Sequence, residues 1–139
     1  NLMMMLFVLY GYHMYTFEHS VDVAIYACML YLSTISDNND IDKKMFIDLF
    51  ICGLLHDIGK IAIPVDILDE KGETSSEDWE IIKRHPIYSF KIVTNLCKCD
   101  SKIFKEYKND VSRRNRLTYG VLLHHRSAED VKDESNTIE

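Results

Sequence analysis

Helical spacing of apolar residues is the feature that most constrains the fold. Apolar residues recur at this spacing along most of the 139-residue chain, and no segment sustains the period-2 alternation of a β-strand. The dense apolar stretch 2–32 predicts one or two helices, with a loop at 37–40. A second long helix is predicted for 41–59, ending near Gly59. The chain is therefore expected to be all-α.

The middle of the chain contains a predicted connection and a predicted helix start. Pro64 forces the residue before it toward extended geometry, so 60–73 is expected to link two helices. Ser75 is a candidate N-cap, because Asp78 follows three residues later and the first turn is acidic. We therefore expect a helix to begin at this serine.

The C-terminal half predicts further helices and a tail. His85 precedes a proline and is expected to end a helix, after which another helix is expected from Tyr88 to about Cys97. The last helix is expected to end with His124 and His125. The polar, acidic segment 126–139 is expected to be flexible, which leaves 1–125 as one helical domain.

Composition excludes some functions. The chain has 16 Lys+Arg against 22 Asp+Glu and a formal charge of −6, which argues against a DNA-binding surface. The four cysteines do not form the two pairs of a zinc site, so we expect reduced thiols and a cytoplasmic protein. The apolar opening 1–17 is shorter than the ~20 residues that span a bilayer, which favours a buried amphipathic helix over membrane insertion.

Histidines are the residues most indicative of chemistry. Imidazole and carboxylate ligands suit Fe, Mn or Zn, and one carboxylate can bridge two ions ~3.5–4 Å apart. Asp57 follows His56 at the end of an apolar run and is the candidate bridge. The candidate metal ligands are His19, His56, Asp57, His85, His124 and His125. We expect these six residues to line one cavity.

Each residue also has an interpretation without a metal. His19 alone on an apolar face is more often a core histidine, and His56 beside Asp57 could be a helix-end pair. The adjacent pair at 124 and 125 could simply be exposed. Lys60 lies three residues after Asp57, so its ammonium could neutralise a phosphate or form a structural salt bridge with that carboxylate. His13 has no carboxylate neighbour in sequence and is assigned to structure.

Three segments together resemble the HD-GYP family, a branch of the HD phosphohydrolase superfamily. They are YTFEHSVDVAIYA, LLHDIGKIAIPVDILDEKGETSSEDWEIIKRHP and LLHH, in this order between Tyr15 and His125. The resemblance implies a helical bundle around a metal centre and hydrolysis of a phosphodiester in cyclic di-GMP or a related cyclic dinucleotide. It puts the six candidate ligands on metal-binding positions and Lys60 beside the scissile phosphate. Asp57 and Lys60 are thus the expected catalytic residues.

The chain departs from the family pattern in four places, one of which is Arg126, where the family usually has glutamate after the histidine pair. Tyr15 stands where members of the three-metal type have glutamate, so a site with two ions is expected. The Gly-Tyr-Pro motif is absent, and 132–134 read Lys-Asp-Glu instead. The family's later aspartate ligand falls beyond Glu139. The domain is therefore expected to be incomplete on its C-terminal side, and Arg113, Arg114 and Arg116 could supply phosphate contacts or form a solvated face.

Two classes of function follow from the resemblance. The first is a metal-dependent phosphodiesterase with two divalent ions, Fe or Mn before Zn, acting on a cyclic dinucleotide. The second is a catalytically silent HD-GYP-like signalling or binding module. Another nucleotide phosphohydrolase of the HD superfamily is the alternative among enzymes. Weak or no turnover of cyclic di-GMP is expected from this chain alone, and an upstream sensory domain and a homodimer are compatible with the family.

Overall fold

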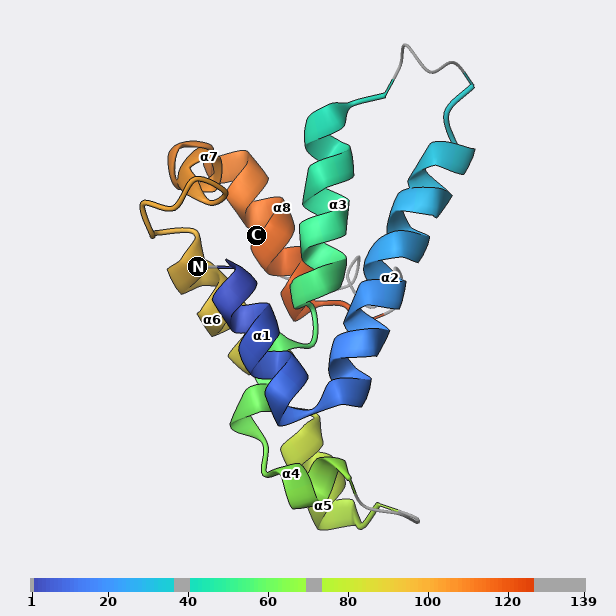
Figure 1. Ribbon diagram of the computed structural model, residues 1–139, viewed down its shortest axis with the longest axis vertical. Coiled ribbons are helices and arrows are strands. Elements are labelled where there is room, and N and C mark those ends of the chain that lie inside the picture. Colours follow the sequence, from blue (N-terminus) through green and yellow to red (C-terminus); the bar gives the residue numbers. More distant parts are fainter. Residues whose placement is uncertain (1, 37–40, 70–73, 127–139) are drawn as a thin grey trace, which may run out of the picture.

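The computed structural model describes residues 2–36, 41–69 and 74–126 (Figure 1). Every regular element in this part of the chain is a helix, which confirms the predicted all-α class. The elements are α1 (Leu2–Tyr12), α2 (Met14–Ser33), α3 (Lys43–Leu55), the 3₁₀ helix η2 (Ile58–Ala62), α4 (Val65–Leu68), α5 (Ser76–Ile82), α6 (His85–Leu96), α7 (Lys105–Asn109) and α8 (Val111–Leu122).

The first apolar stretch forms two helices that are separated at His13. The backbone of His13 is extended, and its Nδ1 accepts a hydrogen bond from the backbone N–H of Thr16, so this histidine is the N-cap of α2. Its Nε2 lies 3.1 Å from Oδ1 of Asp69. His13 is therefore used to start a helix and to fix the segment after α4. The predicted loop at 37–40 lies outside the described residues.

The helix boundaries differ from prediction at several places. Ser75 caps α5 as expected, accepting from the backbone N–H of Asp78. His85, however, begins α6 rather than ending a helix. The proline after it occupies the first turn, where its missing N–H needs no partner. α3 ends at Leu55, four residues early, and α8 ends at Leu122, so the histidine pair follows the last helix instead of ending it.

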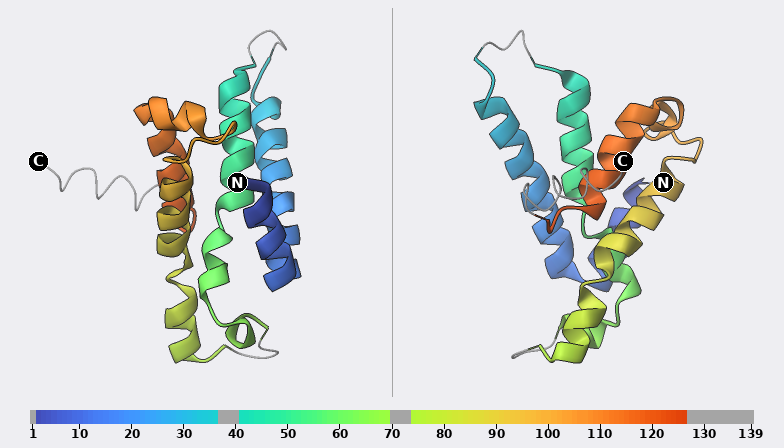
Figure 2. Two further views of the ribbon diagram at one scale, coloured as in Figure 1. Left: turned by 60° about the vertical axis from the view of Figure 1, so that its left-hand side comes forward. Right: turned by 180° about the vertical axis from the view of Figure 1, so that it is seen from behind.

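The helices pack so that the ends of several elements meet near the centre of the molecule. Figure 1 shows α2 and α3 as an antiparallel pair, and α6 packs against both η2 and α8. α8 also contacts α3, while α1 packs on α2 and η2. Figure 2 shows the same arrangement from two other sides. A continuous apolar core that includes Leu9, Leu55, Ile58, Val93 and Val121 joins these elements.

Gly59 allows the close packing of η2 against the start of α6. Its backbone N–H donates to the buried Oγ of Ser89 at 2.8 Å. A Cβ at this position would collide with the carbonyl oxygen of His85 and the backbone nitrogen of Ser89. The glycine therefore fixes the distance between the Asp57 segment and His85.

Replacing Gly59 with alanine should lower the free energy of unfolding by about 2–3 kcal/mol, because the added methyl group overpacks this contact. The matched control is Gly11→Ala in α1, where nothing lies within 4 Å of a new Cβ. That change should be neutral or stabilising by up to about 1 kcal/mol. Denaturant unfolding of both variants checks the prediction, and equal stabilities would contradict it.

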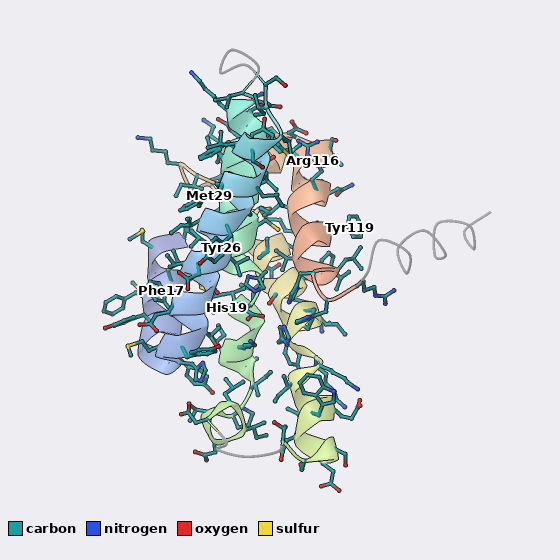
Figure 3. All side chains as sticks on the ribbon, turned by 90° about the vertical axis from the view of Figure 1, so that its right-hand side faces the viewer. Phe17, His19, Tyr26, Met29, Arg116 and Tyr119 are labelled. Carbon is teal, nitrogen blue, oxygen red and sulfur yellow. The ribbon has the colours of Figure 1, made fainter. Side chains whose placement is uncertain are left out.

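The outer face of α1 and α2 is more apolar than predicted. α1 buries Leu2 and Leu9 but exposes Met3, Met4 and Phe7, so it is not amphipathic as expected. On α2, Tyr26 and Met29 lie on the surface seen in Figure 3 and are 66% and 59% exposed. No helix in the described ranges is both long and apolar enough to cross a membrane.

A buried ionic network joins α3 to α7 and α8. Oδ1 of Asp48 accepts hydrogen bonds from Oη of Tyr107 at 2.6 Å and from Nε of Arg113 at 2.7 Å. Arg113 is 3% exposed and also pairs with Glu106. It is therefore neither a phosphate contact nor part of a solvated face, and both sequence interpretations of it are wrong. Arg116, by contrast, has a half-exposed side chain, which agrees with the interpretation of a solvated face.

Candidate metal centre

Asp57 lies at the centre of the histidine cluster, immediately after α3. Its side chain is almost fully buried. Nζ of Lys60 lies 2.7 Å from Oδ2, so the salt bridge considered from the sequence is present. Nε2 of His85 is 2.9 Å from Oδ1, while Nε2 of His124 is 3.6 Å from Oδ1 and Nε2 of His56 is 3.5 Å from Oδ2. Both carboxylate oxygens thus face imidazole nitrogens.

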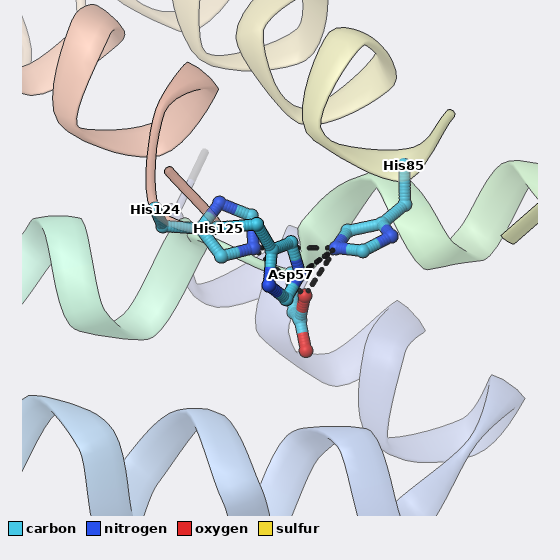
Figure 4. A group of neighbouring side chains, drawn as sticks. All are labelled: Asp57, His85, His124 and His125. Atoms are coloured by element: carbon cyan, nitrogen blue, oxygen red, sulfur yellow. Dashed lines mark hydrogen bonds and ion pairs between the residues drawn. The ribbon is translucent and has the colours of Figure 1, made fainter. Parts of the chain in front are cut away.

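The six predicted ligands converge on this carboxylate in two groups. One group is Asp57, His85, His124 and His125, and the other is His19, His56 and Asp57; within each, the ligand atoms lie within 4.8 Å of one another. Figure 4 shows the first group, with the ring of His85 approaching from α6 and the histidine pair from the segment after α8. Asp57 belongs to both groups, which is the position of a bridging ligand.

The tautomers of three histidines are fixed by the backbone. In His56, His85 and His124, Nδ1 lies 2.7 Å from the carbonyl oxygen of the residue three positions earlier. A carbonyl oxygen only accepts, so each Nδ1 carries the hydrogen and each neutral ring presents a lone pair at Nε2. This backbone support is the arrangement that orients histidines as metal ligands.

The Nε2 atoms of His85 and His124 face each other with no hydrogen between them, because both hydrogens lie on Nδ1. Nε2 of His85 lies 3.2 Å from Nε2 of His124 and 3.1 Å from Nε2 of His125. Oδ1 of Asp57 is buried, and no group in the described part of the chain donates a hydrogen bond to it. Lone pairs converging on one point repel unless a cation lies among them. The donor set therefore fits a divalent metal ion better than it fits a single shared proton.

Burial and charge hold these groups in their ligating forms. Desolvation lowers the pKa of His125 to about 4, helped by the neighbouring His124 and His85, and this favours the neutral ring although His125 is partly exposed to solvent. Burial also lowers the pKa of His56, although the charge of Asp57 opposes it. For Asp57, burial raises the pKa, but the positive charge of Lys60, whose Nζ lies 2.7 Å from Oδ2, opposes burial and helps to hold the pKa below its usual range. Neutral imidazoles around an ionised carboxylate are what metal binding requires.

His19 reaches the cluster because α2 and α3 approach closely. A Cβ on Gly53 would lie 2.5 Å from Cα of Ala24, so only glycine permits this helix separation. The rings of His19 and His56 are consequently 5.3 Å apart. His19 is exposed rather than buried, so the core interpretation of it is wrong. Tyr15, one turn earlier, is 73% exposed and belongs to neither group of ligands.

The space around the cluster is divided, whereas one cavity was expected. One pocket of about 350 Å³ is lined by residues that include His19, His56 and His124. Another pocket of about 710 Å³, on the α5 and α6 side, is lined by residues that include His85 and His125. His125 contributes to both. The six residues thus converge, but the five histidines line two pockets and Asp57 lines neither.

Sequence reasoning missed Ser89, which holds η2 against α6. It lies one helical turn after His85, is fully buried, and accepts the hydrogen bond from Gly59. The sequence did offer one sign of this role: Ser89 lies four residues after the candidate ligand His85, on an apolar face of the same helix. Its partner could not have been read from the sequence, because the two residues are 30 positions apart.

Comparison with known proteins identifies related sequences. The model of the HD domain family matches residues 16–138. A cyclic di-GMP phosphodiesterase of Pseudomonas aeruginosa is 35% identical over 72 residues, which are 52% of this chain and 16% of that protein. Cyclic di-GMP phosphodiesterase PdeB of Borreliella burgdorferi is 34% identical over 80 residues, 58% of this chain and 20% of that protein.

A third relative is 3'3'-cGAMP-specific phosphodiesterase 3 of Vibrio cholerae, 32% identical over 83 residues, 59% of this chain and 17% of that protein. The chain thus matches a fifth or less of the length of these relatives. No solved structure is significantly similar to it. The family match covers most of the chain and includes Asp57 and the five histidines that converge on it. The chain belongs to the HD domain family, as the resemblance in its sequence predicted.

Proposed function

We propose that this chain is a metal-dependent phosphohydrolase domain that cleaves a phosphodiester bond of a cyclic dinucleotide. The observation that carries the proposal is the convergence of the unprotonated Nε2 atoms of His56, His85 and His124 on the buried carboxylate of Asp57. The names of the relatives, which are cyclic di-GMP and 3'3'-cGAMP phosphodiesterases, support the substrate class. The low count of basic residues agrees with a small anionic ligand held locally rather than a polymer.

Under this proposal two divalent transition-metal ions, Fe or Mn before Zn, would be held with Asp57 as the shared ligand. His85, His124 and His125 would hold one ion, and His19 and His56 would hold the other. Such ions supply Lewis-acid activation of the phosphodiester and of the attacking water. The protein itself supplies fixed imidazole orientations, through the backbone carbonyls, and a positive charge at Lys60.

In this proposal Lys60 acts on the phosphate. Its side chain is 21% exposed, and its ammonium lies beside the carboxylate that both groups of ligands share. A cation in this position neutralises charge that develops on phosphate oxygens during cleavage. In this proposal the salt bridge with Asp57 holds the ammonium in place for that role.

The test is metal analysis of protein purified without chelators, followed by incubation with cyclic di-GMP and 3'3'-cGAMP. We expect about two ions per chain and linear or mononucleotide products. Lys60→Ala should reduce hydrolysis by about 10²-fold and leave the metal content unchanged. Lys44→Ala, at an exposed lysine on α3, is the matched control. Metal binding without hydrolysis of either substrate would contradict the enzyme proposal and favour the silent signalling module.

Several expectations stay predictions. These are a cytoplasmic location, a homodimer and an upstream sensory domain. Weak or no turnover was expected from the sequence of 126–139, of which only Arg126 lies within the described residues. Measuring the rate in the experiment above tests that expectation.

A further inference from the structure

We propose that the pocket between α5, the start of α6 and residues 122–126 is a nucleobase subsite, in which the indole of Trp79 stacks on a base of the substrate. This inference rests on the proposed function and goes beyond it, because it names the residue that recognises the base. The ligand class is a nucleotide whose phosphate lies at the metal centre and whose base lies against α5.

The position of the pocket connects it to the metal centre. It has a volume of about 710 Å³. Its lining residues include His85 and His125, which belong to one group of candidate metal ligands. The rest of the wall is mostly apolar, with Ile82, Pro86 and Leu122 among the lining residues. A molecule with one end at the histidines can therefore place an apolar, planar group in this pocket.

Trp79 provides the stacking surface. It lines the pocket from α5 and is 51% exposed, although a tryptophan is usually highly buried. The ammonium of Lys83, which also lines the pocket, is 5.8 Å from the centroid of the indole ring. An aromatic face next to a cation is the combination that binds a base together with its phosphate backbone.

Lys83 can respond to a phosphate. It pairs with Glu80 at 2.7 Å, and both side chains are at least half exposed. Exposed ion pairs contribute little to stability, so an incoming anion can displace the glutamate. The edge of the pocket is therefore positively charged where the sugar-phosphate part of a nucleotide would lie.

The pocket on the other side of the histidines is a poorer site for a base. It has about half the volume, and its described lining residues include no lysine, arginine, tryptophan, tyrosine or phenylalanine. Its wall is formed by small or aliphatic side chains such as Val23 and Ala27, together with histidines. We therefore assign the base to the side of Trp79.

Fluorescence tests the inference directly, because Trp79 is the only tryptophan of the chain. The metal-loaded protein is titrated with guanosine 5'-monophosphate and, separately, with ribose 5-phosphate. Stacking of guanine should quench the tryptophan emission saturably. The sugar phosphate, which has no base, should leave it unchanged. Emission that does not respond to guanosine 5'-monophosphate, or responds equally to both, would overturn the inference.

Variants separate stacking from a structural role. Trp79→Ala should weaken binding of guanosine 5'-monophosphate about tenfold, the size of a lost base–aromatic contact, without changing metal content or ribose 5-phosphate binding. Trp79→Phe should recover most of the affinity. Tyr26→Ala removes an exposed aromatic side chain from α2 and should change nothing. Unchanged affinity in Trp79→Ala would contradict the proposal.

The outcomes also distinguish this inference from the proposed function. Hydrolysis of cyclic di-GMP with no quenching and an unchanged KM in Trp79→Ala would leave the enzyme proposal intact and reject the subsite. Quenching by guanosine 5'-monophosphate without hydrolysis would support the subsite and reject catalysis. The absence of both would reject both proposals.

Discussion

The Asp57→Ala variant should be isolated with no bound metal and should no longer hydrolyse a cyclic dinucleotide. Asp57 is the one residue that both groups of candidate ligands share, so its removal affects both ions together. It also leaves the facing Nε2 atoms of His85, His124 and His125 without the carboxylate that attracts a cation to them. Elemental analysis of protein purified without chelators measures the loss.

Adding a chelator should no longer lower the Tm of the Asp57→Ala variant. An ion that binds only the folded state stabilises it by mass action, by about 2.7 kcal/mol when its free concentration is 100 times Kd. For a domain of this size, chelation should therefore lower the wild-type Tm by about 10 °C, while the Tm of Asp57→Ala should not move. Asp66→Ala, at an exposed carboxylate on α4, is the matched control and should respond like wild type. Full metal content in Asp57→Ala would show that Asp57 is only a helix-end residue.

Much of the fold and of the candidate site could be predicted because both are encoded locally. Helical spacing gave the all-α class, and an N-cap serine with an acidic first turn gave the start of α5. The residue types of the site were also visible, since His56 and Asp57 interrupt an apolar run where an unpartnered charge is costly. That five histidines meet around Asp57 was expected only through the family resemblance, because spacing in the sequence does not show which residues converge.

The errors came from tertiary contacts. A proline can follow the end of one helix or occupy the first turn of the next, so the sequence around Pro86 allows both. In the structure Pro86 lies in the first turn of α6, and the contact between Gly59 and Ser89 holds that helix in position. Arg113 is buried because Asp48, 65 positions earlier in the chain, supplies its partner. A single sequence contains no record of either contact. The pocket beside Trp79 was missed for the same reason.

Asp48→Ala should be the most destabilising change outside the metal centre. It removes the acceptor that Tyr107 and Arg113 share and leaves a buried guanidinium with Glu106 as its remaining carboxylate partner. Breaking a buried pair by removing one partner costs about 3–5 kcal/mol. The free energy of unfolding, from denaturant titration, should fall by that amount.

A paired replacement and a metal readout make this prediction specific. The double variant Asp48→Leu with Arg113→Met removes both buried charges, so it should recover most of the stability that Asp48→Ala loses. Because Asp48 does not belong to either group of candidate ligands, Asp48→Ala should keep its metal and its Tm should still fall on chelation, unlike that of Asp57→Ala. A loss below about 1 kcal/mol in Asp48→Ala would mean that solvent reaches Arg113 and replaces its partner. Loss of metal from the folded variant would instead mean that the position of α8 on α3 sets the geometry of His124 and His125.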